Sequence, residues 1–363
     1  MTTYLLAGGG TAGHVNPLLA IADRLRARDP EAELIVLGTA EGIEARLVPE
    51  RGYELVTIPR TPMPRRPNAD ALRFPARWRT AVRAVERLIA ERGVDVVFGV
   101  GGYASAPAYV AAHRRRVPIA IHEANARPGW ANRLGARYAR QVGVAFPDTP
   151  IRGAVFVGQP LRPEIERLAD AEVRSAARVE AGEAFGLDPA RPTLLVTGGS
   201  SGALRINATI TAAIDDILQA GWQILHASGE FRDEIALDAP GYRAVRYLDR
   251  MDLALALADC SLGRSGTGTV AETAALGIPA VFIPYTGSNG EQRLNAAGAV
   301  AAGGALLVED AQFTPDWVRS TLIPLLGDRE RLSLMSQRIR SVGAIDGTDR
   351  MVALIDAAAG QRA

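Results

Sequence analysis

Residues 5–25 read LLAGGGTAGHVNPLLAIADRL, and this stretch decides the fold. An apolar run of strand length comes first, three glycines break it, and a helical pattern follows. A strand, a glycine turn and a helix in this order are typical of the start of a doubly wound α/β domain. Gly8, Gly10 and Gly13 also match the G-x-G-x-x-G pattern that binds the pyrophosphate of a dinucleotide. His14 follows the last glycine directly, and that pattern does not account for it.

The composition excludes several classes of protein. The 363 residues suit two domains of ordinary size, and a net charge of +1 gives no general attraction to nucleic acid. Cys260 is the single cysteine, which excludes an intrachain disulfide and favours a buried, inert thiol in a reducing compartment. The sequence has no lysine, so Walker-type phosphate loops and Schiff-base catalysis are excluded. No apolar run reaches the roughly 18 residues of a membrane span, and no cationic leader precedes the first strand.

Strand-length apolar runs alternate with helical patterns along the whole chain. The runs are continuous, as expected for a parallel sheet that is covered on both faces. The pattern of strand, glycine loop and helix restarts at Arg191. We therefore predict two Rossmann-like, doubly wound α/β domains that face each other across a cleft and join near residues 158–168. The expected strands lie within residues 3–9, 32–39, 94–102, 117–125, 140–146 and 154–160, and then 192–197, 221–229, 242–248, 260–266 and 279–286.

Three glycine loops are candidate phosphate sites. They span residues 8–14, 198–203 and 264–269, each between an expected strand and an expected helix. Backbone N–H groups at the start of a helix attract anions, so phosphate is the natural guest. The second and third loops lie in the same domain, where they suit one pyrophosphate. Each loop is also explained as a tight turn that needs glycine for its backbone angles.

A nicotinamide dinucleotide fits this sequence poorly. In dinucleotide-binding domains an acidic residue at the end of the second strand holds the ribose. Here that strand ends in Gly38 and Thr39, while Glu41 and Glu44 come later, on an expected helix. His14 also stands where a dehydrogenase has an ordinary helix residue. The residues therefore disfavour NAD as the ligand.

Polar residues in the second domain suit a sugar nucleotide. Glu272 lies on the helix after the third glycine loop, where its carboxylate can accept hydrogen bonds from two ribose hydroxyls. A surface glutamate is the alternative interpretation. Glu291, Gln292 and Asn295 follow a buried strand and suit sugar hydroxyls, although helix capping explains such residues equally well.

The sequence offers no obvious ligands for a metal ion. It has no D-x-D motif, and its four histidines are widely separated. Helix N-termini and arginines such as Arg162 and Arg264 would therefore have to neutralise a diphosphate.

Seven segments in register resemble the MurG family, the bacterial cell-wall enzymes that make lipid II. They cover the chain from about residue 4 to residue 308. The segments are GGGTAGHVNPLLAIA (8–22), GVGGYASAPAYVAA (99–112), PIAIHEANARPGWANR (118–133), GQPLR (158–162), GGSSGALRIN (198–207), RSGTGTVAETAALGIPAVFIPY (264–285) and EQRLNA (291–296).

The resemblance implies a GT-B fold and an inverting glycosyltransferase. An acceptor domain over residues 1–160 would face the membrane, a UDP-GlcNAc domain would span 161–344, and a C-terminal helix within 345–363 would return to the first domain. GlcNAc would pass from UDP-GlcNAc to the C4 hydroxyl of the muramoyl sugar of lipid I, giving lipid II and UDP. The family needs no obligatory metal, so no cofactor is expected.

Positions that match the family's motifs supply the expected site residues. His14 becomes the candidate general base, with a loop brace as the alternative role. Glu272 would hold the ribose and Gln292 the GlcNAc hydroxyls, and the main chain near Leu248 would contact uracil. The remaining donor residues would be Arg162, Ser200, Arg264 and Thr267, and the acceptor side would be lined by Thr11, Gly13, Tyr103 and Asn125.

The sequence departs from the family's usual motifs at several positions. Ala12 replaces a glycine in the first loop, which would be unfavourable if that position needed a positive φ. None of the departures removes a group that was assigned to chemistry. The others are Ala124, Gln159 and Ser201, and Glu291 adds an acidic neighbour to Gln292.

Residues 60–92 form a strongly basic stretch. They contain nine arginines against three acidic residues, which is a local charge of +6, and apolar residues are interleaved with them: Leu72, Phe74, Trp78, Val82 and Val85. A basic, aromatic-bearing helix suits docking to the anionic cytoplasmic face of a membrane, as a lipid-linked acceptor requires. An ordinary helix with a solvated arginine face is the alternative. The expected membrane patch is Leu72, Phe74, Arg77, Trp78 and Arg79.

Other functions remain open from the residues alone. Another GT-B lipid glycosyltransferase with a different UDP-sugar is the nearest alternative, because GlcNAc is favoured only through the family. A dinucleotide oxidoreductase and a non-catalytic nucleotide sensor are further alternatives.

Overall fold

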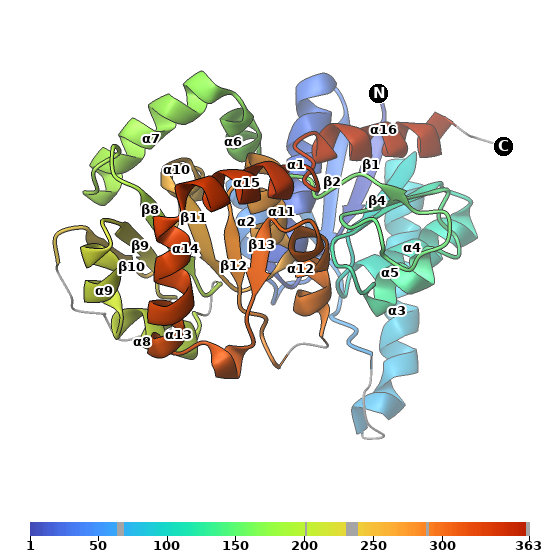
Figure 1. Ribbon diagram of the computed structural model, residues 1–363. Coiled ribbons are helices and arrows are strands. Elements are labelled where there is room, and N and C mark those ends of the chain that lie inside the picture. The colour runs from blue at the N-terminus through green and yellow to red at the C-terminus, as the bar shows by residue number, and fades with distance from the viewer. Residues whose placement is uncertain (64–68, 200–201, 230–238, 288–289, 361–363) are drawn as a thin grey trace. The chain divides into compact units, whose positions relative to one another are not determined.

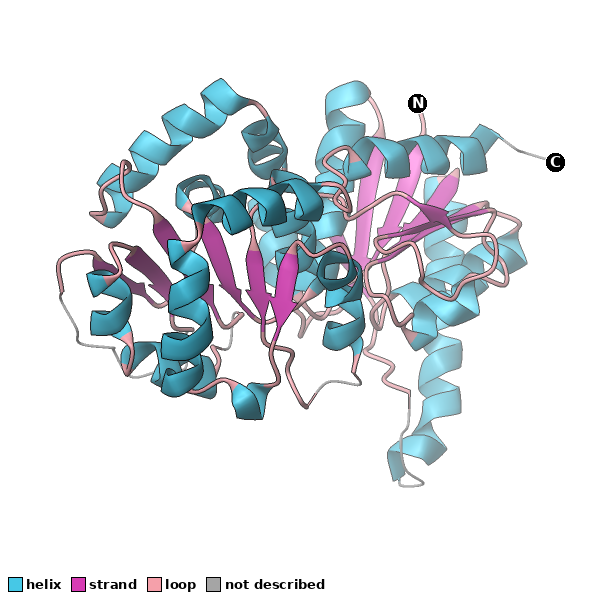
Figure 2. Cartoon of the chain, in the orientation of Figure 1, coloured by secondary structure: helices cyan, strands magenta, loops and turns pink. Residues whose placement is uncertain are grey.

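The computed structural model describes residues 1–63, 69–199, 202–229, 239–287 and 290–360 (Figure 1). The chain divides into two compact units. Unit 1 comprises Met1–Arg162 and Asp346–Ala363, and unit 2 comprises Pro163–Ile345. Each unit holds one parallel β-sheet with helices on its faces (Figure 2). The prediction of two doubly wound α/β units is confirmed.

Unit 1 contains a seven-stranded sheet in the order β3-β2-β1-β4-β5-β6-β7. Every pair of neighbouring strands is parallel. The elements are β1 (Thr3–Ala7), α1 (Ala12–Arg28), β2 (Glu33–Gly38), α2 (Glu44–Glu50), β3 (Glu54–Thr57), α3 (Ala69–Arg92), β4 (Val96–Gly99), α4 (Ser105–Arg115), β5 (Ile119–Glu123), α5 (Trp130–Gly135), β6 (Gln141–Val144), β7 (Val155–Phe156) and α16 (Gly347–Gly360).

Both faces of this sheet are buried, and β1 shows how. Leu5 and Leu6 are both fully buried, and because successive side chains of a strand point to opposite faces, they enter different cores. Leu6 belongs to the core that α1 and α16 cover, and Leu5 to the core that α3 and α4 cover. A strand buried on both faces needs a continuous apolar run, which is the pattern of residues 3–7.

The C-terminal helix α16 belongs to unit 1. Met351 and Ile355 are fully buried in the core beside α1. Two ion pairs join the same helices, Arg24 with Asp349 and Arg28 with Asp356. The helix begins where the main chain passes close to residue 159, because a Cβ at Gly347 would lie only 2.6 Å from the carbonyl oxygen of Gln159.

Cys260 is fully buried in the core of unit 2, and this burial raises the pKa of the thiol to about 12, as suits an inert cysteine.

Unit 2 repeats this architecture with a six-stranded parallel sheet in the order β10-β9-β8-β11-β12-β13. The elements are α6 (Pro163–Glu166), a 3-10 turn (Arg167–Ala169), α7 (Ala171–Phe185), β8 (Thr193–Thr197), α8 (Leu204–Thr211), α9 (Ile214–Gln219), β9 (Gln223–Ala227), β10 (Tyr242–Val245), α10 (Met251–Leu257), β11 (Cys260–Gly263), α11 (Thr267–Leu276), β12 (Ala280–Phe282), α12 (Glu291–Ala301), β13 (Ala305–Leu307), a 3-10 turn (Asp310–Gln312), α13 (Pro315–Trp317), a π-helical turn (Val318–Leu322), α14 (Ile323–Gly327) and α15 (Arg329–Arg340).

Two strands were not expected from the sequence, β3 and β13. Both lie at the edge of a sheet, and β3 is half exposed along its length. A short edge strand has no continuous apolar run, so its pattern does not stand out from that of a loop.

Candidate active site

The strand order reverses at equivalent places in the two units. In unit 1 the strands that follow β1 are added on one side of it, and those from β4 onward are added on the other side. In unit 2 the same change of direction occurs between β8 and β11. Loops at the carboxyl ends of such strands form the usual binding crevice of a doubly wound fold. The three loops of unit 1 that matter span residues 8–11, 100–104 and 124–129, after β1, β4 and β5.

The first glycine loop ends where α1 begins. Gly10 has a φ of +93°, which favours glycine, whereas Ala12 and Gly13 belong to the helix and have no positive φ. Ala12 in place of a glycine therefore introduces no backbone strain. The position does not need a positive φ, so the departure from the family's motif is not unfavourable here.

His14 lies in the first turn of α1. Its Nδ1 is 3.2 Å from the hydroxyl oxygen of Thr11, the residue before the helix. Its Nε2 faces the main chain of the second loop, because a Cβ at Gly101 would lie 3.4 Å from this nitrogen. Burial lowers the pKa of the imidazole, and the charge of Glu44 opposes this in part. At neutral pH the ring is therefore a neutral base.

Glu44 is a buried carboxylate whose contacts with the first glycine loop the sequence reasoning missed. Although it begins helix α2, its carboxylate is buried beneath the first glycine loop. It accepts hydrogen bonds from the N–H of Gly10 at 2.8 Å and from the N–H and hydroxyl of Thr39 at 2.9 and 2.8 Å. The N–H of Gly10 is thus already bonded within the protein. The expectation of a phosphate at this loop stays a prediction, which rests on the N–H groups at the start of α1.

The second loop lies against the first. Gly101 and Gly102 have φ values of +95° and +90°, and a Cβ at Gly102 would lie 2.5 Å from the carbonyl oxygen of Gly9. Tyr103 follows directly, and the guanidinium carbon of Arg60 lies 4.4 Å from the centre of its ring. The structure therefore brings Tyr103 to the same edge of the sheet as Thr11 and His14.

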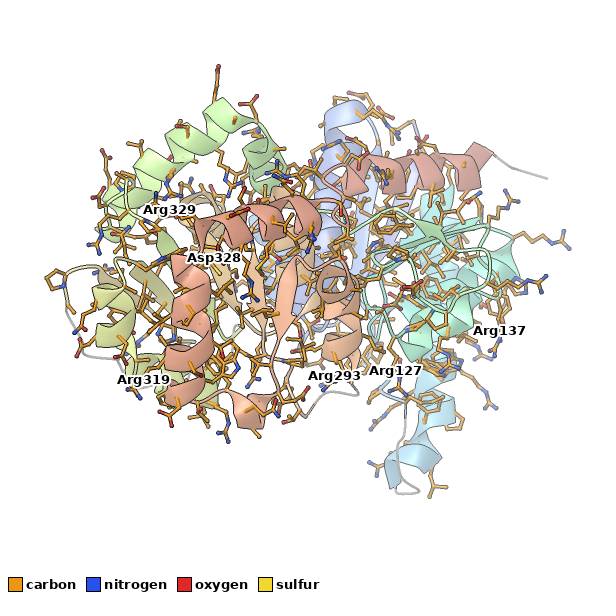
Figure 3. The ribbon with its side chains drawn as sticks, in the orientation of Figure 1. Arg127, Arg137, Arg293, Arg319, Asp328 and Arg329 are labelled. Carbon is orange, nitrogen blue, oxygen red and sulfur yellow. The ribbon has the colours of Figure 1, made fainter. Side chains whose placement is uncertain are left out.

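A second buried carboxylate, Glu123, holds the third loop. It accepts hydrogen bonds from the N–H groups of Asn125 and Gly129 at 2.9 and 3.0 Å and from the side chain of Asn132 at 3.0 Å. Ala124 is almost fully buried, whereas Arg127 in the same loop is exposed (Figure 3). The sequence reasoning missed Glu123 and Asn132, although both stand inside the segment that it quoted.

In unit 2 the glycine loop after β8 is only partly described. Ser200 and Ser201 lie outside the described residues. Gly202 has a φ of +71°, and a Cβ there would lie 2.2 Å from the carbonyl oxygen of Ser228. Only glycine fits at this close approach between the loop and the residues that follow β9.

Arg264 does not point to an open anion site. Its guanidinium donates to the carbonyl oxygens of Ile283 and Pro284 at 3.1 and 3.2 Å, and it forms an ion pair with Asp310 at 2.6 Å. The side chain is 13% exposed. Arg264 is therefore held by partners within unit 2, and its contact with a diphosphate stays a prediction.

The remaining donor residues gather at the carboxyl ends of β11 and β12. Thr267 begins α11, and its hydroxyl lies 3.3 Å from the amide nitrogen of Asn295, so Asn295 supports the loop. Gln292 lies in the first turn of α12, and its side-chain oxygen accepts a hydrogen bond from the N–H of Tyr285 at 2.9 Å. Glu272 is half-buried on α11.

Leu248 and Arg162 belong to other segments of the chain than these loops. Leu248 is buried in the segment between β10 and α10, where only its main chain suits a ligand. Arg162 is the last residue of the first segment of unit 1, and it is half-buried.

The first turns of α3 carry an apolar surface. Leu72 is 85% exposed, and Phe74 stacks on Trp78 with ring centres 5.8 Å apart. Trp78 also meets Trp130 of α5 at 6.0 Å, which the sequence reasoning missed. Arg77 and Arg79 are exposed on the same helix. In the part of the chain that the structure describes, no helix is both long and apolar enough to cross a bilayer.

Two other apolar residues of this helix do not belong to that surface. Val82 and Val85 are almost completely buried in the core between α3, α4 and the sheet. The apolar residues of α3 therefore divide between an exposed first part and a buried later part, because only the later part lies on the sheet.

Comparisons with known proteins agree with this architecture. The model of the glycosyltransferase family 28 N-terminal domain matches residues 4–144, and that of the C-terminal domain matches residues 193–351. A protein of Leifsonia xyli subsp. xyli is 61% identical over 98% of both chains, and one of Streptomyces coelicolor is 50% identical over 99% of both. Both are named "UDP-N-acetylglucosamine--N-acetylmuramyl-(pentapeptide) pyrophosphoryl-undecaprenol N-acetylglucosamine transferase". The crystal structure of MurG from Acinetobacter baumannii covers 98% of this chain, and the chain covers all of it, with a TM-score of 0.77 and 26% identity.

Proposed function

The chain belongs to glycosyltransferase family 28 and, within it, to the MurG family, and on this premise we propose that it makes lipid II. The enzyme transfers GlcNAc from UDP-GlcNAc to the C4 hydroxyl of the muramoyl sugar of the undecaprenyl-linked acceptor, lipid I. The products are lipid II and UDP. The reaction contributes to peptidoglycan synthesis and hence to the building of the bacterial cell wall.

The position and state of His14 support this reaction best. Thr11 fixes one ring nitrogen, Nε2 faces the second loop, and burial lowers the pKa, so the ring is neutral at the pH of the reaction. Nε2 accepts the proton of the acceptor's C4 hydroxyl while that oxygen attacks the anomeric carbon of GlcNAc. The bond from this carbon to the UDP oxygen breaks, and the configuration inverts. Such base assistance is typically worth roughly 10² to 10⁴ in rate.

Unit 2 supplies the groups that bind UDP-GlcNAc in this proposal. Glu272 holds the ribose hydroxyls, the main chain at Leu248 contacts uracil, and Gln292 contacts the GlcNAc hydroxyls. Thr267 and Ser200 contact the diphosphate, while Arg162, the last residue of the first segment of unit 1, adds positive charge. We assign Arg264 a different role from the one its charge first suggested, since its bonds to Ile283, Pro284 and Asp310 fix the loop.

Unit 1 supplies the groups that receive lipid I. Tyr103 and Asn125 lie in the loops that follow β4 and β5, and a Cβ at Gly13 would meet only the hydroxyl oxygen of Thr11, at 3.8 Å. Leu72, Phe74, Arg77, Trp78 and Arg79 form the membrane patch, and Trp130 extends it. This patch docks on the anionic cytoplasmic face of the cell membrane, where the lipid-linked acceptor is anchored.

The decisive experiment measures GlcNAc transfer from UDP-GlcNAc to a lipid I analogue in EDTA. We expect transfer by the wild type without added metal, and a loss of at least about a hundredfold in His14→Ala. His113→Ala is the matched control, because His113 is an exposed histidine on α4. No transfer by the wild type would contradict the acceptor assignment, and an active His14→Ala would contradict the base.

The choice of donor is tested separately. We expect UDP-GlcNAc to raise the melting temperature of the protein and NADH to leave it unchanged. Faster transfer from UDP-glucose or UDP-galactose would contradict the assignment of GlcNAc as the donor sugar. It would not affect the fold or the proposed role of His14 as the base.

A further inference from the structure

We propose that Glu44 is a positioning residue for the transfer reaction, which holds the glycine loop in front of His14 and sets the electrostatic field in which His14 accepts its proton. This inference rests on the proposed function. It concerns a carboxylate that touches neither substrate, so it acts through the loop and through His14.

The carboxylate joins the ends of two neighbouring strands. Its three donors are the N–H of Gly10 after β1 and the N–H and hydroxyl of Thr39 after β2, all within 2.9 Å. Glu44 is 1% exposed, and its two bonds to Thr39 are buried, while the bond to Gly10 is part-buried. Hydrogen bonds to a buried charge are stronger than those between neutral groups, and together they fix the loop.

The chain leaves room for this carboxylate by means of glycine. A Cβ at Gly9 would lie 2.3 Å from a carboxylate oxygen, and one at Gly42 would lie 2.0 Å from the other. A Cβ at Gly38 would lie 2.6 Å from the Cγ of Glu44. Three glycines, one after β1, one at the end of β2 and one shortly after it, therefore leave a space that the glutamate side chain fills.

The carboxylate remains ionised in this space. Burial raises the pKa of Glu44, but the hydrogen bonds from Gly10 and Thr39 outweigh burial, so the pKa lies below its ordinary value. A negative charge is therefore present beneath the loop at the pH of the reaction.

This charge acts on His14, together with the other groups around the ring. Burial lowers the pKa of His14, and the charge of Glu44 raises it. His122 on β5 also interacts with the ring, but burial lowers its own pKa to about 4, so it is neutral at neutral pH. Behind Gly101 lies the side chain of Asn132, which is bonded to Glu123 of β5 and Tyr109 of α4. Burial raises the pKa of Glu123 and of Tyr109, which disfavours their charged forms.

The same charge changes where an acceptor pyrophosphate can be bound. The N–H of Gly10 is bonded to Glu44, and a phosphate beside it would be repelled. The first N–H groups of α1, around residues 11–13, are then the donors that face the acceptor. Glu44 therefore divides the loop into two parts. The N–H of Gly10 holds the loop in place, and the first N–H groups of α1 bind the pyrophosphate of the acceptor.

The experiment is the pH profile of kcat/KM for wild type and Glu44→Gln. A general base works when it is neutral, so activity rises with pH through the pKa of His14. Removing the negative charge lowers that pKa, and the acid limb therefore moves to lower pH, while the plateau falls by about tenfold to a hundredfold because the loop loses its position. The KM for UDP-GlcNAc stays within twofold.

Two variants serve as controls. Glu41→Gln removes an exposed carboxylate of the same segment and leaves the profile unchanged. Glu44→Asp keeps the charge on a shorter side chain, so its acid limb stays near that of the wild type while its rate falls.

Each outcome decides the inference. A Glu44→Gln enzyme whose acid limb coincides with that of the wild type would overturn it, whatever its rate. Should this variant fail to fold, Glu44→Asp with full activity would also overturn it. Absence of transfer by the wild type would instead contradict the proposed function itself.

Discussion

The glycine loops after β1 and after β8 arise from the same pattern, yet the protein supports them differently. Behind the first lies a charged group, Glu44, bonded to Gly10 and Thr39. Behind the second lies a neutral network in which Asn207 donates to the carbonyl oxygen of Ser228 at 2.8 Å and faces His226 at 3.2 Å. Burial lowers the pKa of His226 to about 4, so this network carries no charge at neutral pH.

The difference teaches that a glycine loop does not by itself define a phosphate site. A buried carboxylate beneath a loop repels a diphosphate and suits a loop that positions a base. A neutral support leaves the N–H groups and the helix dipole free of repulsion and suits a loop that receives a diphosphate. The predictions below test this contrast, beginning with the largest expected effect.

Removal of the charged support is expected to destabilise the protein more than removal of the neutral one. Glu44→Ala leaves two buried donors of Thr39 and one part-buried donor of Gly10 without an acceptor, and the free energy of unfolding should fall by about 4 kcal/mol. Asn207→Ala removes two hydrogen bonds of the neutral network, with an expected loss of about 2 kcal/mol. Urea unfolding of the two variants measures both values, and equal losses would contradict the distinction.

Acid should destabilise both units through histidines that are buried in their neutral forms. His122 and His226 have pKa values lowered from 6.5 to about 4 by burial. Above about pH 6.5 these histidines are neutral in both the folded and the unfolded state, so they do not change the stability. As the pH falls from 6.5 to 4, the unfolded chain binds a proton that the folded protein does not, and stability is lost over this interval. The loss is about 3 kcal/mol for each histidine. Urea unfolding at pH 7 and pH 4 should show a smaller acid loss in His226→Gln and His122→Gln than in the wild type; an unchanged loss would refute the assignment.

Addition of a methyl group should distinguish the backbones of the two loops. Gly202→Ala places a Cβ against the carbonyl oxygen of Ser228 at a positive φ, so we expect a loss of about 2 kcal/mol and at least tenfold weaker binding of UDP-GlcNAc. Gly10→Ala meets no atom within 4 Å, and only the φ of +93° opposes it, so about 1 kcal/mol is expected. Thermal unfolding measures the loss of stability, and titration calorimetry measures the affinity for UDP-GlcNAc. A larger loss in Gly10→Ala than in Gly202→Ala would contradict the prediction.

The smallest effect is expected at the outer surfaces of the two units. Arg79→Gln on α3 removes one basic residue from the membrane patch and should weaken binding to vesicles rich in phosphatidylglycerol by about 1 kcal/mol, which is roughly fivefold. Arg331→Gln, an exposed arginine on α15 of unit 2, is the matched control and should change nothing. Vesicle co-sedimentation at two salt concentrations measures this, and equal effects of both variants would remove the assignment of the patch to unit 1.

The sequence predicts the fold well because fully buried parallel strands need continuous apolar runs. The same reasoning missed β3 and β13, which are short edge strands. It also named Val82 and Val85 beside the exposed apolar residues of the basic stretch without separating the two sets, since an apolar helix face that meets a sheet has the same periodicity as one that meets a lipid surface. Only the position of α3 along the sheet separates the two.

The candidate site shows where such reasoning ends. The position of His14 after a glycine loop is visible in the sequence, and its proposed role came from the resemblance. The roles of Glu44 and Arg264 depend on partners that lie elsewhere in the chain, Gly10 for the first and Asp310 for the second. The sequence did contain one indication that Glu44 is buried. Gly38 and Gly42 precede it, and neither has a positive φ that would explain a glycine at its position. A charged residue among unexplained glycines indicates a buried ion.

The return of α16 to unit 1 has a consequence for how the protein is made. Unit 2 is an uninterrupted stretch of chain, whereas unit 1 needs residues that are synthesised after unit 2. We expect unit 2 to fold while still attached to the ribosome, and unit 1 to wait with the apolar surface around Leu18 exposed until Met351 and Ile355 emerge to cover it. The first domain of the sequence is therefore the last to be completed, and during this interval the nascent chain would depend most on chaperones.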